Sequence, residues 1–446
     1  MRSSWIMYLL VLGMMAFHSH GAFGKENAAF APGPDEAQLP RTMHSAMAEH
    51  PQVRVGQTEG DLVGQDHRVL QAAVDYVAGL GGGTVEVGPG VYTMYDSLHL
   101  RSHVTVRGIK GETILKKAAG AVSPLALDGD FGEEQITLAD PTGFAVGYGV
   151  TVWDDNAGGF HTTVARLTGR RGSTFSISTP LMADCMVQNQ AKAATVFPVI
   201  SGYDLEEACV EDLVVDGNRG NNVHLNGCRG AGIFLYRGFG STIRRCVVRD
   251  FNGDGISFQQ SNEVTVDQSI CEGNASLGIH PGSGSQRPVV RECVARGNGL
   301  DGLFLCWRVR HGRFEGNTLE ANGRFGISIG HKDSDNVLRG NLVRQNGQDG
   351  VFFRHESAGM AAHRNRLEGN TIENNGRMGP AAGIRIRGHT NDLVFVDNVI
   401  RDTRQGDART QVTGILIEET VGAVTLQENR IEAKDAIIDQ RTNRPK

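Results

Sequence analysis

A short hydrophobic pattern recurs along the second half of the chain: a glycine, then Ile, Leu or Val, then any residue, then another apolar residue. The first five intervals between these glycines are 23 or 24 residues long, and the last two are 33 and 31 residues long. A period this long and regular indicates a solenoid of stacked coils. The pattern starts at Gly232, Gly255, Gly278, Gly302, Gly326, Gly350, Gly383 and Gly414.

Two series of small or polar residues keep nearly the same period. The first series is Cys246, Ser269, Cys293, Asn317, Asn341, Asn370, Asn398 and Asn429, and the second is Asn274, Asn298, Asn322, Asn346 and Asn375. Stacked coils bring equivalent positions together, so the asparagines should pair amide to amide in ladders. Cys246 and Cys293 should lie ~9.6 Å apart, too far for a disulfide. The asparagines are therefore assigned a structural role.

The repeats favour an all-β fold, a parallel β-helix, over a leucine-rich repeat. Ile and Val alternate with a two-residue period, and no helix-length pattern lies between the strands. A leucine-rich repeat would need a Leu-x-x-Leu-x-Leu frame and often a helical return. We assign the β-helix repeats to residues 199–433 and a C-terminal tail to residues 434–446.

Two segments before the repeats follow other patterns. Apolar residues recur at helical spacing between Asp66 and Gly79, namely Val69, Leu70, Ala73, Val74 and Val77. We predict a capping helix and the first coils over residues 61–125. Over residues 126–198, short alternating segments separated by Gly, Asp and Asn predict a small inserted antiparallel β subdomain.

The N-terminus resembles a secretion signal. Arg2 precedes an apolar run from Trp5 to Phe17, and Ala22 and Gly24 are small residues at the spacing that signal peptidase uses. The run is short for the ~20 residues of a membrane span. We predict a cleaved signal peptide over residues 1–24, a lead-in segment over residues 25–60, no membrane span after cleavage, and a secreted or periplasmic location.

Composition and charge narrow the class of ligand. The 59 glycines among 446 residues fit many regular turns. The 44 Lys and Arg against 50 Asp and Glu give a net charge of −6, which argues against a general nucleic-acid binder. Between Arg287 and Arg313, however, six arginines face only Glu292 and Asp301. A basic patch on an acidic protein suits a discrete anionic ligand.

The chain also resembles a known superfamily. The segment LQAAVDYVAGLGGGTVEVGPGVYTM, the following LHLRSHVTVRG and the asparagine-bearing coils are similar to pectate-lyase-like right-handed parallel β-helix proteins. The resemblance covers roughly Asp61–Leu115 and Val199–Asn429. It implies a right-handed, single-stranded solenoid. It leaves the reaction open, since the superfamily includes lyases, hydrolases, epimerases, phage tailspikes and non-catalytic members.

Charged and aromatic residues follow three consecutive strands of the repeat. Counting from each strand glycine, the fifth place holds Trp307, His331 and His355, and the sixth holds Arg308, Lys332 and Glu356, with Asp333 next. Adjacent coils lie ~4.8 Å apart, so these side chains should form one patch about 10 Å tall on a solvent-facing edge. A solvated row of turn residues is the structural alternative.

This patch suits a uronic acid polymer. Lyases and C5-epimerases of uronates both remove the proton next to a carboxylate, which needs a base and a cation. The catalytic candidates are His331, His355, Lys332, Arg308, Asp333 and Glu356. The candidates for binding the substrate are Trp307, Arg310, Arg354, Arg385, Arg387 and His280, because indole rings stack on sugars and guanidinium groups grip carboxylates.

Two segments partly resemble other families and leave other catalytic residues and reactions open. NGDGISF, Asn252 to Phe258, and GIRIRG, Gly383 to Gly388, resemble polygalacturonase segments, with Asp254 and Asp301 as alternative acid and base. At ~9.6 Å these two would lie at the upper edge of the separation for inverting hydrolysis, and ASLG stands where that family has paired aspartates. GIHPGSGS, Gly278 to Ser285, falls where mannuronan C5-epimerases have Asp-Pro-His-Asp, so His280 could serve as a base.

The sequence thus predicts an exported carbohydrate-active β-helix protein acting on an anionic, uronate-type polysaccharide by lyase or C5-epimerase chemistry. A polygalacturonase-type glycoside hydrolase and a non-catalytic glycan-binding or structural solenoid are the alternatives. No metal-binding residues are assigned, and calcium is the one cofactor left open. The polysaccharide is the expected partner, nucleic acid is not, and the oligomeric state is left open.

Overall fold

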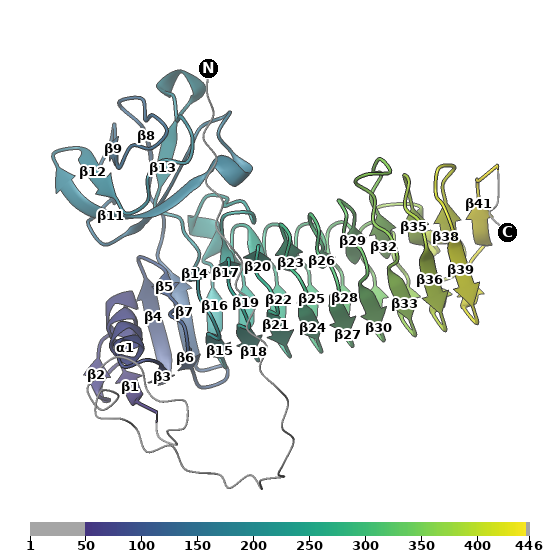
Figure 1. The fold of residues 1–446 in the computed structure, drawn as a ribbon, viewed down its shortest axis with the longest axis horizontal. Coiled ribbons are helices and arrows are strands. Elements are labelled where there is room, and N and C mark those ends of the chain that lie inside the picture. The colour runs from purple at the N-terminus through teal and green to yellow at the C-terminus, as the bar shows by residue number, and fades with distance from the viewer. Residues whose placement is uncertain (1–49, 443–446) are drawn as a thin grey trace, which may run out of the picture. The chain divides into compact units, whose positions relative to one another are not determined.

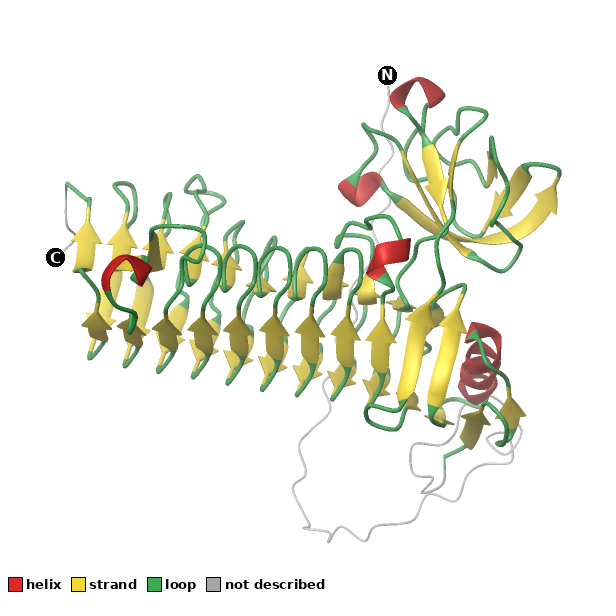
Figure 2. Ribbon diagram, turned by 180° about the vertical axis from the view of Figure 1, so that it is seen from behind, coloured by secondary structure: helices red, strands yellow, loops and turns green. Residues whose placement is uncertain are grey.

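The computed structural model describes residues 50–442, which form a parallel β-helix of three long sheets with a small inserted subdomain (Figure 1). Each coil adds one strand to each sheet, so strands from successive coils lie side by side (Figure 2). The predicted all-β parallel β-helix is confirmed. The predicted signal peptide and most of the lead-in segment lie outside the described residues.

Each of the three sheets runs from the N-terminal end of the coils to the C-terminal end. Sheet A consists of β2 (Leu62–Val63), β1 (Gln52–Gly56), β3 (Gly83–Val87), β6 (Val104–Arg107), β15 (Cys209–Glu211), β18 (Thr242–Arg244), β21 (Thr265–Asp267), β24 (Val289–Arg291), β27 (Arg313–Glu315), β30 (Val337–Arg339), β33 (Arg366–Glu368), β36 (Leu393–Val396) and β39 (Val424–Gln427). Sheet B consists of β4 (Gly90–Met94), β7 (Thr113–Lys117), β16 (Val214–Asp216), β19 (Val247–Arg249), β22 (Ile270–Glu272), β25 (Val294–Arg296), β28 (Thr318–Glu320), β31 (Leu342–Arg344), β34 (Thr371–Glu373), β37 (Val399–Arg401) and β40 (Arg430–Glu432). Sheet C consists of β5 (Leu98–His99), β14 (Ile200–Tyr203), β17 (Ala231–Tyr236), β20 (Asp254–Gln259), β23 (Ile279–Gly282), β26 (Leu303–Phe304), β29 (Ile327–Ile329), β32 (Val351–Phe353), β35 (Ala381–Ile386), β38 (Gln411–Ile417) and β41 (Asp435–Asp439).

The recurring Gly-Ile pattern supplies the strands of sheet C. Leu303 of β26 pairs with Ile327 of β29, and Ile327 pairs with Val351 of β32. These residues are buried at 1% exposure or less and belong to one continuous core inside the coils. Because side chains alternate along a strand, the residue after each of them projects from the outer face of sheet C. That outer face carries the candidate site described below.

The predicted asparagine ladders are confirmed. In the second series, Asn322 Nδ2 donates to Asn346 Oδ1 at 3.0 Å, and Asn298 Nδ2 donates to Asn322 Oδ1 at 2.9 Å. In the first series, Asn317 pairs with Asn341 in the same way at 2.9 Å. Each ladder also satisfies backbone groups where the chain turns between sheets. The seven cysteines of the sequence are all free thiols, so no disulfide supports the coils.

The helix α1 (His67–Gly79) covers the N-terminal end of the coils (Figure 1). It begins at Asp66, whose carboxylate accepts a hydrogen bond from the N–H of Arg68 at 2.9 Å. The apolar face predicted for it is buried, with Leu70, Val74 and Val77 at 0% exposure. The helix therefore shields core residues and sheet edges that the first coil would otherwise expose.

The inserted subdomain is a six-stranded antiparallel sheet that leaves the coils after β7. Its strands, in order, are β8 (Val122–Pro124), β13 (Lys192–Ala194), β10 (Gly149–Trp153), β11 (Thr163–Arg171), β12 (Thr174–Ile177) and β9 (Gln135–Thr137). It has its own core, which includes Val150, Leu167 and Phe175. The chain thus enters and leaves the insert between β7 of sheet B and β14 of sheet C.

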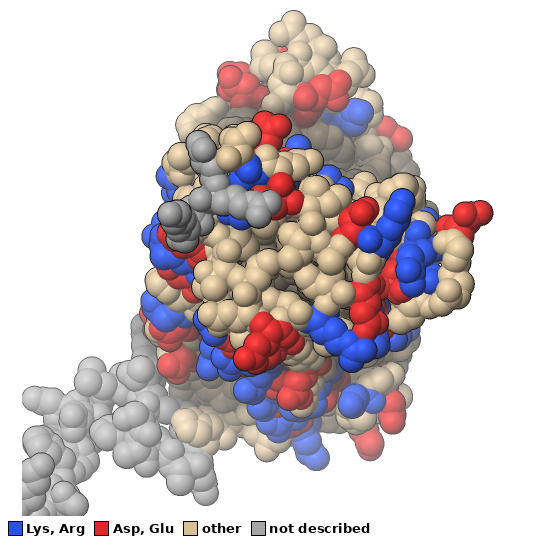
Figure 3. All heavy atoms as spheres, turned by 90° about the vertical axis from the view of Figure 1, so that its right-hand side faces the viewer, with Lys and Arg blue, Asp and Glu red and all other residues tan. Residues whose placement is uncertain are grey.

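Charged side chains surround the last coil, around an uncharged centre (Figure 3). Arginines of one coil pair with carboxylates of the preceding coil, as Arg344 does with Glu320 at 2.7 Å and Arg401 with Glu373 at 2.8 Å. Such exposed pairs add little stability individually, but they keep each charge beside an opposite one. Within residues 50–442, none of the helices has the length and apolar character needed to cross a membrane.

Lys117 is a buried cation, and replacing it should stabilise the protein. Burial lowers the pKa of Lys117 to about 7, from an ordinary 10.5. The folded state therefore disfavours the charged form that the unfolded chain prefers, so this penalty is full below pH 7 and vanishes as the pH rises through the unfolded value. Lys117→Met should raise the free energy of unfolding at pH 7 by roughly 2–4 kcal/mol, with the difference shrinking toward pH 10.

Chemical denaturation of both proteins between pH 6 and pH 10 checks this expectation. The carbonyl of Ala118, which accepts from Lys117, also accepts from Asn222, so the variant leaves it with a partner. Lys116→Met, at the exposed neighbouring position, is the matched control and should change little. A destabilised Lys117→Met protein at pH 7 would contradict the burial penalty.

Candidate functional site

The predicted aromatic and charged patch lies where strands β26 and β29 of sheet C end. The indole of Trp307 and the imidazole of His331 are in contact, with ring centroids 5.3 Å apart. Trp307 is 42% exposed. Trp307, Arg308, His331 and Lys332 all have positive φ angles, 67°, 66°, 47° and 67°. Two consecutive left-handed residues in each of two adjacent coils are costly for non-glycine side chains, and such conformations concentrate at functional sites.

The imidazole of His331 is paired with a carboxylate from the next coil. Nε2 of His331 lies 2.9 Å from Oε1 of Glu356, whose side chain is 14% exposed. Nδ1 of His331 is buried without a hydrogen-bond partner. Burial, followed by the positive charge of Arg354, lowers the pKa of His331. A neutral ring that donates from Nε2 to Glu356 satisfies this geometry, so His331 and Glu356 form one proton-sharing pair.

The regular coil register ends at Lys332. The N–H of Arg308 donates to the carbonyl of His331 at 2.9 Å, as stacked coils require, but the N–H of Lys332 donates to Met360 at 2.6 Å. The interval from Gly350 to Gly383 is longer than the others, and the offset between paired residues grows from 24 at Ile329 and Phe353 to 29 at Val337 and Arg366, so part of the extra length lies between β32 and β33 and the rest between β34 and β35. Glu356 is the side chain from this coil that contacts His331, whereas His355 is exposed, which corrects the expectation from equal spacing that His355 stacks next to His331.

Asp333 does not face solvent, which corrects the expectation that it shares the exposed rim. It is 0% exposed and accepts hydrogen bonds from the N–H groups of Val309 and Gly330, at 2.9 Å and 3.1 Å. It also lies 3.1 Å from Nη2 of Arg354. Burial raises the pKa of Asp333 to about 7. Asp333 therefore stabilises the turn after β29 and forms an ion pair with Arg354.

Arg354 links this patch to the outer face of sheet C. Its guanidinium lies over the ring of Phe304, 4.5 Å from the centroid, and donates to Ser328 Oγ at 2.8 Å. Arg308 is exposed, Lys332 and Arg310 are half-buried, and none of the three forms an ion pair with another described residue. Arg308 and Lys332 directly follow Trp307 and His331 in the chain, whereas Arg310 lies close enough to Asp335 to lower the pKa of that carboxyl, in addition to the larger effect of Arg364.

A second histidine and carboxylate pair lies on sheet C, deeper than the first. Nδ1 of His280 is 2.7 Å from Oδ2 of Asp254, and the His280 ring packs edge-on against Phe304, 5.2 Å between centroids. Both side chains are at most 4% exposed. A Cβ placed on Gly227 would collide with Asp254, so the segment before β17 covers this pair. Substrate would reach it only after that segment moved.

The alternative acid and base pair is not supported by these contacts. Asp301 is fully buried and receives two hydrogen bonds from Arg324, at 2.8 Å and 2.9 Å, and one from the N–H of Phe325. Asp254 is held by His280. Both carboxylates therefore have partners inside the protein, and neither faces open space from which a glycosidic bond could be approached.

Arg385 and Arg387 line a separate surface pocket of about 480 Å³. Phe325 and Phe352 form its apolar wall, with stacked rings whose centroids are 4.1 Å apart. Arg385 pairs with Asp349 at 2.8 Å, and Arg387 pairs with Glu418 at 2.9 Å. The structure thus places these two predicted substrate-binding residues in one pocket. Each already has a carboxylate partner, so its positive charge is partly neutralised.

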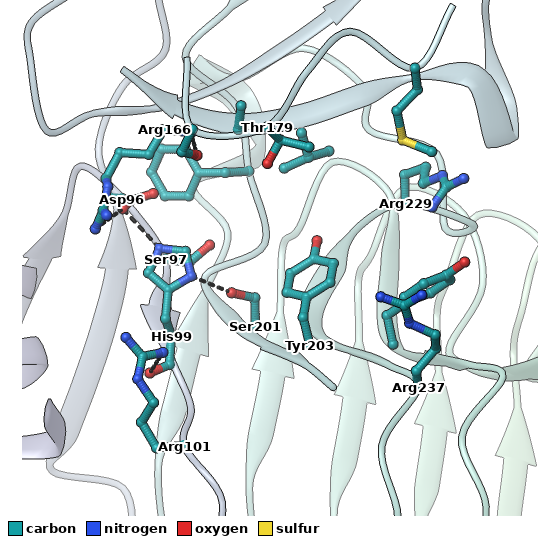
Figure 4. Close-up of a pocket in the computed structure, with 16 residues that line it drawn as sticks. Asp96, Ser97, His99, Arg101, Arg166, Thr179, Ser201, Tyr203, Arg229 and Arg237 are labelled. Atoms are coloured by element: carbon teal, nitrogen blue, oxygen red, sulfur yellow. Dashed lines mark hydrogen bonds and ion pairs between the residues drawn. The ribbon is translucent and has the colours of Figure 1, made fainter. Parts of the chain in front are cut away.

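Another pocket, which the sequence did not predict, lies between the first coils of sheet C and the insert. Its volume is about 530 Å³. The coils contribute His99, Ser201 and Tyr203, and the insert contributes Arg166 and Thr179 from β11 and the segment after β12 (Figure 4). We call this pocket the insert cleft. Arg101, Arg229 and Arg237 also line it, but Arg101 pairs with Asp75 at 2.8 Å and Arg237 with Asp204 at 2.6 Å, so both are partly neutralised.

A hydrogen-bonded chain of three side chains lies in the insert cleft (Figure 4). Nε2 of His99 is 2.9 Å from Oδ2 of Asp96, and Nδ1 of His99 is 3.0 Å from Oγ of Ser201. His99 and Ser201 are opposite each other in the paired strands β5 and β14. Their separation of 102 residues, and the insert between them, hid this contact from the repeat pattern. Only the strand pairing identifies it.

No metal site can be assigned to these side chains. Within residues 50–442, His, Cys, Asp and Glu side chains do not gather in groups of three or more that could hold a metal ion. The neighbours of these histidine and carboxylate pairs are other side chains: Ser201 at His99, Gln259 at His280 and Arg166 at Asp96.

Comparisons with known proteins agree with the architecture. Residues 213–365 match a family model described as a right handed beta helix region. The A-modules of two mannuronan C-5 epimerases of Azotobacter vinelandii, AlgE6 and AlgE4, align with 86% of this chain and with 97% and 96% of theirs. Their TM-scores are 0.55 and 0.54, at 16% and 17% identity. The Dettilon tailspike protein gp208 has a TM-score of 0.52 at 12% identity, covering 86% of this chain and 62% of that one.

Comparison with curated protein sequences finds no match. Identities this low compare folds and do not transfer residue roles. The family model describes right-handed coils, which is also the hand that parallel crossover connections almost always take. The chain therefore has the fold of the right-handed parallel β-helix superfamily.

Proposed function

We propose that this protein is a carbohydrate-active enzyme that removes the C5 proton of an anionic, uronate-type polysaccharide, as a lyase or a C5-epimerase. The observation that carries the proposal is the contact of an exposed Trp307 with His331, which is itself paired with Glu356. The indole can stack on a sugar ring, the proton-sharing pair can remove a proton, and the unpaired cations can bind the sugar carboxylate. The epimerases and tailspike with the same fold add context but assign no residue of this chain.

The contacts suggest a role for each group. Trp307 stacks on a sugar ring, and Arg308 and Lys332 bind its carboxylate and offset the charge that develops there. His331 presents only Nε2 toward Glu356, so Glu356 is the proton acceptor and the imidazole orients it and shares the proton. Elimination of the C4 oxygen would then give a lyase product, and reprotonation on the opposite face would give the epimer.

Exposure favours this pair over the buried one on sheet C. The side chain of His331 is 28% exposed, whereas that of His280 is 4% exposed. A polymer can approach the first pair along the rim of sheet C without displacing any segment. His280 and Asp254 then support the outer face, together with the ring of Phe304. An exported location, secreted or periplasmic, remains a prediction that rests on residues 1–24.

Incubation of the purified protein with pectate, alginate, glucuronan and glycosaminoglycans in deuterated water tests the proposal. A lyase should produce a new ultraviolet absorbance from the C4–C5 double bond, and an epimerase should incorporate deuterium at C5, seen by NMR. New reducing ends without either signal would indicate the hydrolase. Binding to a polyuronate with no chemical change would indicate a non-catalytic solenoid and contradict the proposal.

A further inference from the structure

The insert cleft contains an acid, a base and a hydroxyl in a row, independent of the patch around His331. Asp96, His99 and Ser201 are joined by hydrogen bonds of 2.9 Å and 3.0 Å through the two nitrogens of one imidazole (Figure 4). The side chains of Asp96 and His99 are 3% and 27% exposed, and Ser201 is buried. Two of the three groups are thus held under the surface while the histidine faces the cleft.

The hydrogen bonds determine which way protons can move. A carboxylate only accepts, so Nε2 of His99 donates to Asp96. Nδ1 then carries the lone pair and accepts from the hydroxyl of Ser201. This is the arrangement that activates a serine as a nucleophile: a base in contact with its hydroxyl, and a third group that orients the base. The roles depend on this order of contacts rather than on which ring nitrogen faces the serine.

The surroundings of Ser201 suit an acyl group. Tyr203 lies two residues after Ser201 in β14, so both side chains project from the same face of the strand and line the cleft. Tyr203 is 41% exposed, and a tyrosine hydroxyl is protonated at neutral pH, so it can donate a hydrogen bond in the cleft. Arg166 lies 3.8 Å from Asp96 and lies across the cleft on the insert. The hydroxyl of Tyr203 is therefore the donor on the Ser201 side of His99, whereas Arg166 lies on the Asp96 side (Figure 4).

We infer that the insert cleft is an esterase centre that removes acyl groups from polysaccharide hydroxyls. Oγ of Ser201 attacks the ester carbonyl while its proton passes to Nδ1 of His99, and the bond from the acyl carbon to the sugar oxygen breaks as that oxygen takes the proton. Water then attacks the acyl-serine, His99 accepts a proton from it, and the carboxylic acid leaves as Ser201 regains its proton.

The cleft also indicates which acyl esters it accepts. Its volume of about 530 Å³ admits a small acyl group and one or two sugar units. Arg101, Arg166 and Arg237 each have a carboxylate partner, so Arg229, which forms no ion pair with another described residue, is the cation that favours an acidic polymer over a neutral one. Within this inference, only the preference for an acidic polymer rests on the proposed function. The serine chemistry stands on the three contacts alone.

Two small probes test the serine chemistry on the full chain. The purified protein should hydrolyse p-nitrophenyl acetate, and a fluorophosphonate should modify it once, at Ser201, as located by peptide mass spectrometry. Ser201→Ala and His99→Ala should each lower the hydrolysis rate by about 10³-fold, and Ser201→Ala should abolish labelling. Asp96 is a positioning residue, so Asp96→Asn should lower kcat with little change in KM.

The matched control is Ser176→Ala, at an exposed serine of β12 that does not line the cleft, and it should keep both labelling and hydrolysis. Labelling of the wild-type protein does not depend on whether a variant folds. No adduct, an adduct at another residue, or equal hydrolysis by folded Ser201→Ala would each overturn the inference. Lyase or epimerase activity on polyuronates is measured separately, so either function can fail while the other remains.

Discussion

His331→Ala is expected to lower turnover of a polyuronate by about 10²–10⁴-fold, the usual contribution of a group that moves a proton in the transition state. Glu356→Gln should have an effect of similar size, because the amide keeps the shape but cannot accept the proton. Affinity for the polymer should change by less than ~1 kcal/mol, since the pair acts on the transition state rather than on binding. Initial rates and equilibrium binding to the same polymer give both quantities.

His103→Ala is the matched control for this experiment. His103 also has a positive φ angle, 60°, and Nδ1 of His103 lies 3.4 Å from Glu207, but this pair is at another corner of the coils. The control variant should retain turnover. Because burial and Arg354 lower the pKa of His331, the acidic limb of the rate profile should lie below the ordinary value of ~6.5. If His331→Ala lost binding and turnover equally, the histidine would only contact the substrate and would not take part in proton transfer.

Asn322→Ala should destabilise the folded protein by about 3 kcal/mol or more. The amide of Asn322 donates to Asn346 and to the carbonyl of Ala295, and its oxygen accepts from both the side chain and the backbone N–H of Asn298. Asn322 is 0% exposed, so the groups left behind lie away from water. The loss should appear as a lower midpoint in chemical denaturation.

Two further asparagine variants show whether the ladder, rather than the residue type, is responsible. Asn429→Ala removes the half-buried last member of the first series, so a smaller loss is expected. Asn221→Ala, at an exposed turn, should stay within about 0.5 kcal/mol of the wild type. Similar midpoints for all three variants would show that the ladder adds no stability.

The sequence by itself determined the β-helix, the asparagine ladders, the capping helix and the contact of Trp307 with His331. Each of these depends on positions that repeat at an almost constant interval or lie within a few residues of each other. Stacking coils at a constant strand spacing converts an equal interval into spatial proximity. The identity of the stacked residues then follows from counting along the chain, without knowledge of any loop.

Three contacts could be known only from the tertiary structure. They are the pairing of His331 with Glu356, the burial of Asp333 beneath Arg354, and the hydrogen bond between His99 and Ser201. The coil that follows Gly350 is longer than its neighbours, and the interval does not say where the extra residues lie, so Glu356 could not be chosen over His355 from spacing. His99 and Ser201 are 102 residues apart because the insert interrupts the coils between them. Contacts made across an irregular loop or an insertion depend on how the chain closes in space, and no periodic pattern contains that information.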